Sequence, residues 1–93
     1  MNTLRLQRLI DARTCLNLAM DECNEHGTYL TAGYLFESAR ERCNEAGDSN
    51  LAFEVDQYLV PEQPLIVAEY RSAFRIADAA IELMDEIEEA MQA

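Results

Sequence analysis

Apolar residues recur at steps of three and four along most of this chain, which is the spacing of one face of an α-helix. The first such segment is capped by Asn2 or Thr3, and Gly27 follows it where a left-handed C-cap residue belongs. We therefore predict a first helix over about residues 3–26. Its apolar positions are Leu6, Leu9, Ile10, Leu16, Ala19, Met20 and Cys23.

The same spacing predicts two further helices before the first proline. The second covers about residues 30–46 and ends at Gly47, again a C-cap residue. Asp48 directly follows and is a strong N-cap type, so a short third helix is expected over about residues 49–60. Pro61 is expected to end it, because the residue before a proline is disfavoured in the α conformation.

The segment Pro61 to Pro64 predicts a rigid corner, after which nothing interrupts a long last helix over about residues 64–91. Ile76 and Leu83 give this helix a second apolar edge, so it is expected to pack on more than one side. At about 40 Å it would partly project or pair with another chain. A heptad seam, widened by Phe74 and Ile81, consists of Tyr70, Ala73, Ala77, Ala80, Met84, Ile87 and Met91.

These elements predict an all-α fold, a single domain over residues 1–93 built as a small bundle of about four helices. The first two helices would be antiparallel, the third short, and the fourth long. With 49% hydrophobic residues, three glycines and two prolines, the chain is too apolar to be a solvated tail. No apolar run approaches the roughly 18 residues that cross a bilayer and no signal-peptide pattern is present, so we expect a cytoplasmic protein.

An aromatic residue, small residues, a turn glycine and a proline follow one another at characteristic spacing in Phe36, Ala39, Gly47, Asp48, Ala52 and Pro64. This stretch resembles a single tetratricopeptide repeat. Arg40 and Asp56 stand where that pattern has a small residue and an aromatic one, and a second unit of about 34 residues is absent. The resemblance therefore implies only an antiparallel helical hairpin.

The residues that usually carry chemistry are few. Cys15, Cys23 and Cys43 form no CxxC pair and are predicted to be small core residues. Cys23 and Cys43 with His26 would supply three zinc ligands, but a fourth is missing. The repeated Cys-Asn-Glu-x-Gly at residues 23–27 and 43–47 is explained by helix capping. Without a phosphate loop or nucleophile motif, we expect no enzyme, cofactor or metal site.

The charge of the chain is more informative about possible partners. The sequence has 18 acidic residues, seven arginines and no lysine, for a net charge of −11. This charge repels nucleic acid and anionic membranes and attracts basic protein surfaces. On the last predicted helix, five acids fall along one side, with Glu88 nearer the apolar edge. The five are Asp78, Glu82, Asp85, Glu86 and Glu89.

Successive acids of this row would lie about 5 to 6 Å apart, close to the roughly 6 to 7 Å between phosphates of a nucleic-acid strand. Their mutual repulsion and their position near a helix C-terminus both cost stability, which a basic partner would relieve. Glu37, Glu41 and Glu45 predict a second row at four-residue spacing on the second helix. All eight residues are candidate partner-binding residues.

In size, charge and helical character the chain resembles phage-encoded proteins that block nucleic-acid-binding host machinery, including DNA-mimic anti-restriction proteins and several anti-CRISPR proteins. The resemblance implies an inhibitor that binds the basic surface of a nucleic-acid-binding protein in the host cytoplasm. Other interpretations stay open: a helical dimerisation or adaptor module whose seam pairs with a second copy, an acidic chaperone-like partner, or an acidic face that is only solvated.

Overall fold

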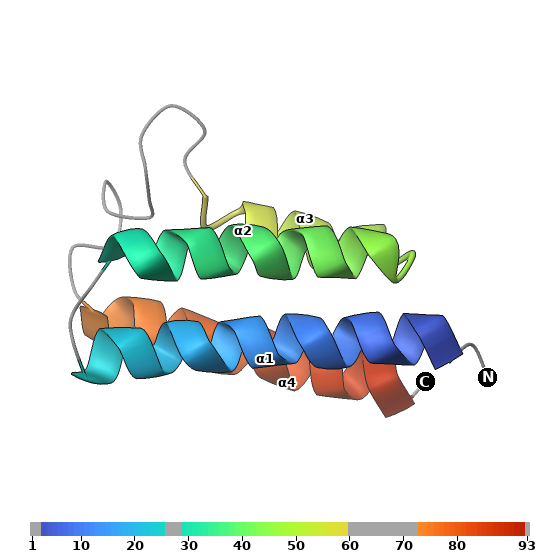
Figure 1. The fold of residues 1–93 in the computed structure, drawn as a ribbon, viewed down its shortest axis with the longest axis horizontal. Coiled ribbons are helices and arrows are strands. Elements are labelled where there is room, and N and C mark those ends of the chain that lie inside the picture. Colours follow the sequence, from blue (N-terminus) through green and yellow to red (C-terminus); the bar gives the residue numbers. More distant parts are fainter. Residues whose placement is uncertain (1–2, 26–28, 60–72, 93) are drawn as a thin grey trace.

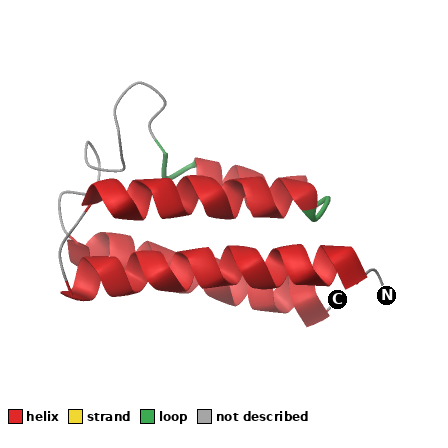
Figure 2. Ribbon diagram, in the orientation of Figure 1, coloured by secondary structure: helices red, strands yellow, loops and turns green. Residues whose placement is uncertain are grey.

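The computed structural model describes residues 3–25, 29–59 and 73–92, and four helices occupy most of this part of the chain (Figure 1). They are α1 (Thr3–Glu25), α2 (Tyr29–Glu45), α3 (Ser49–Asp56) and α4 (Ala73–Gln92). No strand occurs among the described residues (Figure 2). The predicted all-α bundle is therefore confirmed. None of the described helices combines the length and apolar character needed to cross a membrane.

The helices form a small bundle in which α1 runs antiparallel to both α2 and α4 and packs against each of them (Figure 1). α3 lies along α2 and makes a slighter contact with α4. Helices α2 and α4 thus occupy opposite corners, with α1 and the short α3 between them. This arrangement leaves α2 and α4 with outer surfaces that face different directions.

Side chains from all four helices fill the core. Phe36 is completely buried, and its ring meets that of Tyr58 edge to face at a centroid distance of 6.1 Å. Cys23 and Cys43 are buried within the same cluster, which confirms their prediction as small core residues. The other large, fully buried side chains are Leu9, Leu16, Val55, Ile76, Leu83 and Ile87.

The heptad seam of the last helix packs inside the bundle. Its described members Ala77, Ala80 and Ile87 are buried, and Met84 and Met91 pack against the core with part of their surface exposed. Ile81 was expected to widen this stripe but is 44% exposed, so that prediction is wrong. Ile76 and Leu83 lie on the buried side of α4 instead. Tyr70 and the side chains of Ala73 and Phe74 lie outside the described part.

The long last helix was also expected to project in part from the domain or to pair with another chain. Over its described residues, α4 spans about 30 Å at the usual rise of about 1.5 Å per residue, and it lies alongside the longer α1 (Figure 1). The predicted stretch over residues 64–72 lies outside the described residues. Within the described part, α4 is a bundle helix that does not project.

The end of α2 confirms the predicted capping chemistry. Gly47 has a φ of +79°, its N–H donates to the Asn44 carbonyl at 2.9 Å, and the Asp48 N–H donates to the Cys43 carbonyl at 3.0 Å. These two bonds define a Schellman motif, in which the left-handed residue favours glycine. The second copy of the Cys-Asn-Glu-x-Gly repeat is thus a helix end. His26 and Gly27 of the first copy lie outside the described residues.

Helix α3 ends at Asp56, so the predicted end at about residue 60 is wrong. The N–H groups of Tyr58 and Leu59 donate to the carbonyls three residues earlier, at 3.1 and 3.0 Å. This tighter winding ends the α-helix before Pro61 can do so. It also turns Tyr58 toward Phe36 in the core.

Asp48 connects three helices, which gives a first testable prediction. Its Oδ1 accepts a 3.1 Å hydrogen bond from the Leu51 N–H as the N-cap of α3, and its Oδ2 lies 3.2 Å from Nη2 of Arg5 on α1. We expect Asp48→Ala to lower the free energy of unfolding by about 1–2 kcal/mol. Asp48→Asn keeps a capping oxygen and should lose about half as much. Equal losses in urea denaturation would contradict the capping role.

Candidate partner-binding surface

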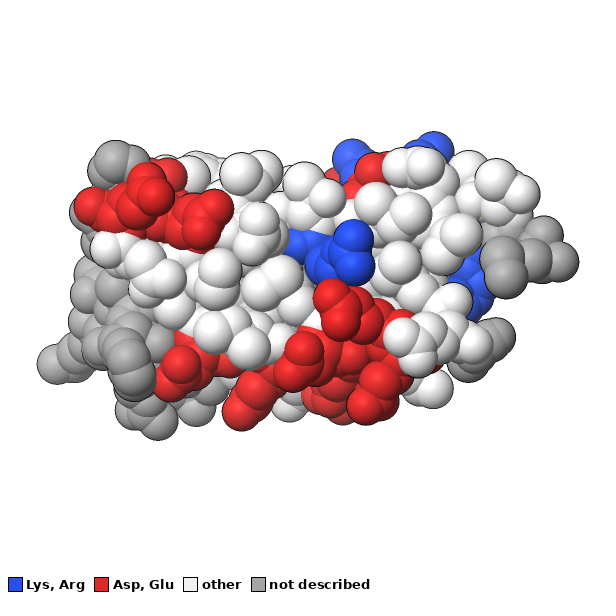
Figure 3. Space-filling model, turned by 90° about the horizontal axis from the view of Figure 1, so that it is seen from below, with Lys and Arg blue, Asp and Glu red and all other residues white. Residues whose placement is uncertain are grey.

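The five acids predicted along one side of the last helix all lie on α4 with exposed side chains. Among the described residues, none of the five makes an ion pair or a side-chain hydrogen bond. Seen from below, one group of acidic side chains lies along one edge of the face that α1 and α4 form, and a second group lies at the opposite edge near one end of the molecule (Figure 3). The five residues are Asp78, Glu82, Asp85, Glu86 and Glu89.

Helical periodicity explains this placement. Ile76, Leu83 and Ile87 are buried in the core, so residues on the opposite side of α4 must face solvent. Glu88 differs because it lies toward α1, where its Oε1 is 3.3 Å from Nη1 of Arg13. Its predicted position nearer the apolar edge is confirmed.

Glu54 of α3 adds a sixth carboxylate that sequence reasoning missed. Partial burial raises the pKa of Glu86, and the neighbouring charges of Glu54, Glu89 and Glu82 raise it further. The influence of Glu54 places it close to the α4 row, although α3 and α4 are separate helices. We call Glu54 together with Asp78, Glu82, Asp85, Glu86 and Glu89 the acidic face.

The raised pKa of Glu86 has a measurable consequence for stability. Because the folded protein favours the protonated carboxyl, this group's contribution to stability is full below its ordinary pKa near 4.5 and is lost as the pH rises through the raised value. We expect Glu86→Gln to stabilise the protein by a few tenths of a kcal/mol at pH 7. The difference should vanish near pH 3 in thermal unfolding measured at both values.

Glu88→Gln is the matched control, on the same helix and of the same residue type. It removes the carboxylate that pairs with Arg13, so it should lower stability slightly at pH 7. A stabilising Glu88→Gln, or a destabilising Glu86→Gln, would contradict the assignment of repulsion to one side of α4 and attraction to the other.

The arginines whose side chains are described pair with acids outside the acidic face. Each of the five whose side chains are described forms an ion pair with an acid of α1, α2, α3, the turn before α3, or Glu88. In one of these ion pairs, Nη1 of Arg40 lies 2.6 Å from Oδ1 of Asp56. The five are Arg5, Arg8, Arg13, Arg40 and Arg42.

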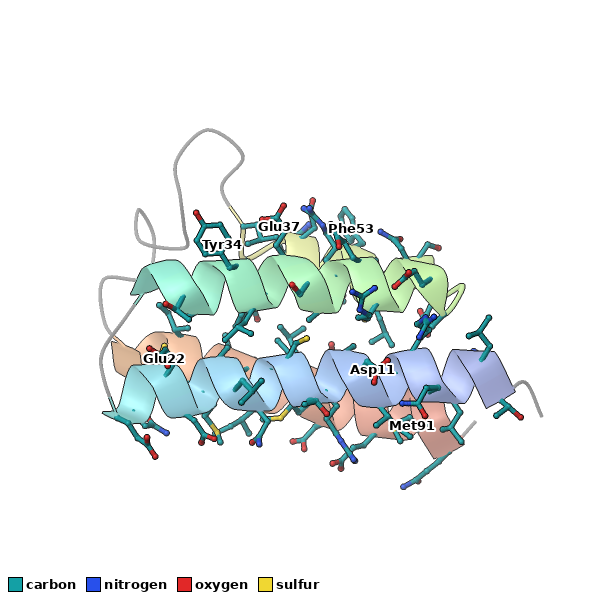
Figure 4. All side chains as sticks on the ribbon, in the orientation of Figure 1. Asp11, Glu22, Tyr34, Glu37, Phe53 and Met91 are labelled. Carbon is teal, nitrogen blue, oxygen red and sulfur yellow. The ribbon has the colours of Figure 1, made fainter. Side chains whose placement is uncertain are left out.

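The predicted second row is not equivalent to the first. Glu37 lies 3.8 Å from Nη2 of Arg40, and Glu45 pairs with Arg42 and lies 3.8 Å from Nε of Arg8. Glu41 is exposed. The structure does not bring this row together with the acids of α4, because α2 and α4 lie at opposite corners; Glu37 points outward from α2 (Figure 4).

The cysteines offer little reactivity. Burial, with smaller effects from Asp48 and Cys15, raises the pKa of Cys43 to about 12. Burial also raises the pKa of Cys23 and Cys15, in the latter case against the opposing charge of Arg42. A thiol with a raised pKa is protonated and unreactive at neutral pH. Among the described residues, no three His, Cys, Asp or Glu side chains are grouped as metal ligands.

Comparison with protein families, curated proteins and solved structures finds no match to this chain. Function is therefore inferred from the chemistry of its surface.

Proposed function

We propose that the protein is a small non-catalytic inhibitor that binds the basic surface of a nucleic-acid-binding protein or complex through its acidic face, in the manner of phage-encoded anti-CRISPR or DNA-mimic proteins. The observation that carries the proposal is the segregation of charge. Five exposed carboxylates on one side of α4 have no cationic partner in the described part, while every arginine whose side chain is described is paired elsewhere.

The spacing of these acids supports a phosphate-like role. Residues four apart on a helix are separated by about 6 Å along its axis, similar to successive phosphates of a nucleic-acid strand. Each carboxylate can accept two parallel hydrogen bonds from an arginine, as a phosphate does. A protein groove that holds DNA or RNA would therefore meet charges of the same sign at a similar interval.

The cost of the acidic face favours binding over a purely solvated surface. Like charges four residues apart each cost a few tenths of a kcal/mol, and no basic residue occupies the last turn of α4 to offset its dipole. A basic partner removes this repulsion when it binds. Inhibition would then require only that the protein occupy the nucleic-acid site, in the host cytoplasm.

The alternative is a helical dimerisation or adaptor module whose acidic face only confers solubility. It draws less support, because the described seam of α4 is packed within a single chain. Ile81 remains exposed on that helix and would be the contact to examine. A seam-driven dimer should persist or strengthen as salt is added, whereas an electrostatic complex should weaken.

The test is a pull-down with tagged protein from the source organism's lysate at low salt, followed by elution with a salt step and mass spectrometry. Glu82→Lys with Glu86→Lys reverses two charges of the acidic face. Asp21→Lys with Glu25→Lys is the control, because it makes the same change in net charge at exposed acids of α1 that are not candidate partner-binding residues. Any captured complex is then tested for displacement of its labelled nucleic acid by the purified protein.

The proposal is supported if the native protein and the control capture a nucleic-acid-binding complex and displace its nucleic acid, while the Glu82/Glu86 variant does neither. Capture of a complex that keeps its nucleic acid would contradict the inhibitor role. Recovery of nothing but further copies of the chain, unchanged by the Glu82/Glu86 reversal, would instead support the dimerisation module.

A further inference from the structure

Phe53 is an aromatic side chain held at the surface. It is 63% exposed on α3, whereas Phe36 on the adjacent α2 is completely buried. Among the described residues, none stacks on the Phe53 ring, although Phe36 and Tyr58 form an aromatic pair in the core below. A ring exposed to this extent contributes little to the fold.

The two sides of Phe53 differ in charge, because within the described residues an unpaired acid lies on one side and an ion pair on the other. The next residue, Glu54, lies toward α4 and influences Glu86 of the acidic face. Asp56, three residues after Phe53, lies toward α2, where Arg40 pairs with it. Phe53 points outward on the side of the bundle away from α1 (Figure 4). Through the adjacent, exposed Glu54, Phe53 borders the acidic face with its ring largely uncovered.

An arginine suits this combination better than a lysine does. The flat guanidinium can stack on an aromatic ring while its N–H groups bind a neighbouring carboxylate in parallel, but an ammonium is a compact, strongly hydrated charge. Aromatic residues and arginine are also enriched where protein surfaces meet. Carboxylates alone attract either cation, so the ring is the element that can distinguish them.

We propose that Phe53 is an arginine-docking position at the edge of the acidic face, where a guanidinium of the partner stacks on the ring and pairs with the neighbouring Glu54. The inference rests on the proposed function and adds the chemistry of the partner: an arginine-bearing surface. The acids supply long-range attraction, and Phe53 supplies a short-range contact that selects arginine. The charge complementarity between a cationic partner and Glu54 and Glu86 favours this occupant over a second, equally acidic copy.

The experiment compares oligoarginine with oligolysine of the same length as probes, titrated at low salt into isotopically labelled protein and followed by NMR. For the native protein we expect oligoarginine to bind about two- to fivefold more tightly and to shift the Phe53 ring resonances. Phe53→Ser should remove this preference and leave oligolysine binding unchanged. Tyr34→Ser is the matched control, because Tyr34 is 71% exposed on α2 but lies far from α4.

Both substitutions alter exposed rings, so unchanged thermal unfolding is expected and is checked first. Equal affinity of the native protein for the two peptides, or an arginine preference that survives Phe53→Ser, would overturn the docking position and leave the proposed function standing. Failure of both peptides to bind would overturn both the docking position and the proposed function. A dimer in sedimentation that Phe53→Ser abolishes would show that a second copy covers the ring, which also overturns the inference.

Discussion

Phe36→Ala is expected to lower the free energy of unfolding by about 3–5 kcal/mol, because it truncates the largest fully buried side chain of the described core. The Phe36 ring also meets Tyr58 edge to face. Truncation leaves a cavity and removes the contact that holds the end of α3 against α2. Small domains have a total stability of about 5–15 kcal/mol, so much of the protein would be unfolded at 37 °C if it lies at the lower limit.

Urea denaturation followed by circular dichroism measures this loss. Phe53→Ala is the control, because it makes the same chemical change at a largely exposed ring and should cost less than about 0.5 kcal/mol. If the two substitutions proved equally costly, the assignment of one phenylalanine to the core and the other to the surface would be wrong.

The second large effect concerns binding. We expect Glu82→Lys with Glu86→Lys to weaken the affinity for oligoarginine about 10- to 100-fold at low salt. The variant loses two attractions and gains two repulsions, each worth about 0.2–1 kcal/mol at an exposed site, and 1.4 kcal/mol corresponds to a factor of ten. Native binding should weaken as salt rises toward physiological ionic strength, where the screening length is about 8 Å.

Isothermal titration calorimetry at several salt concentrations tests this expectation. The Asp21→Lys and Glu25→Lys control carries the same net charge, so it should lose less affinity if the acidic face is the binding surface. Equal losses in the two variants would mean that the peptide responds only to the overall charge of −11.

Most of the fold could be predicted from the sequence because its signals are local. Apolar spacing and the glycine after α2 place the ends of α1 and α2 within about one residue of those observed. The end of α3 could not be predicted in this way. It depends on Tyr58 leaving the helix to pack on Phe36, a contact between residues on separate elements.

The candidate site likewise combines features that local sequence spacing predicts with contacts between helices that only the fold reveals. Exposure of the α4 acids follows from their spacing relative to Leu83 and Ile87, which is visible in the sequence. The acids of α2 have equally regular spacing, yet Arg8 of α1 reaches Glu45, and only the packing of the two helices reveals that pair. The approach of Glu54 to Glu86 likewise requires the position of α3 beside α4.

The acidic face concentrates unpaired negative charge along α4 in the described part of the molecule. Near a basic surface, this uneven charge would produce a torque before any atoms touch. The protein would therefore rotate during its approach so that α4 leads. A larger fraction of collisions would then begin in a binding orientation, and the association rate would exceed that of a protein of equal charge spread evenly over its surface.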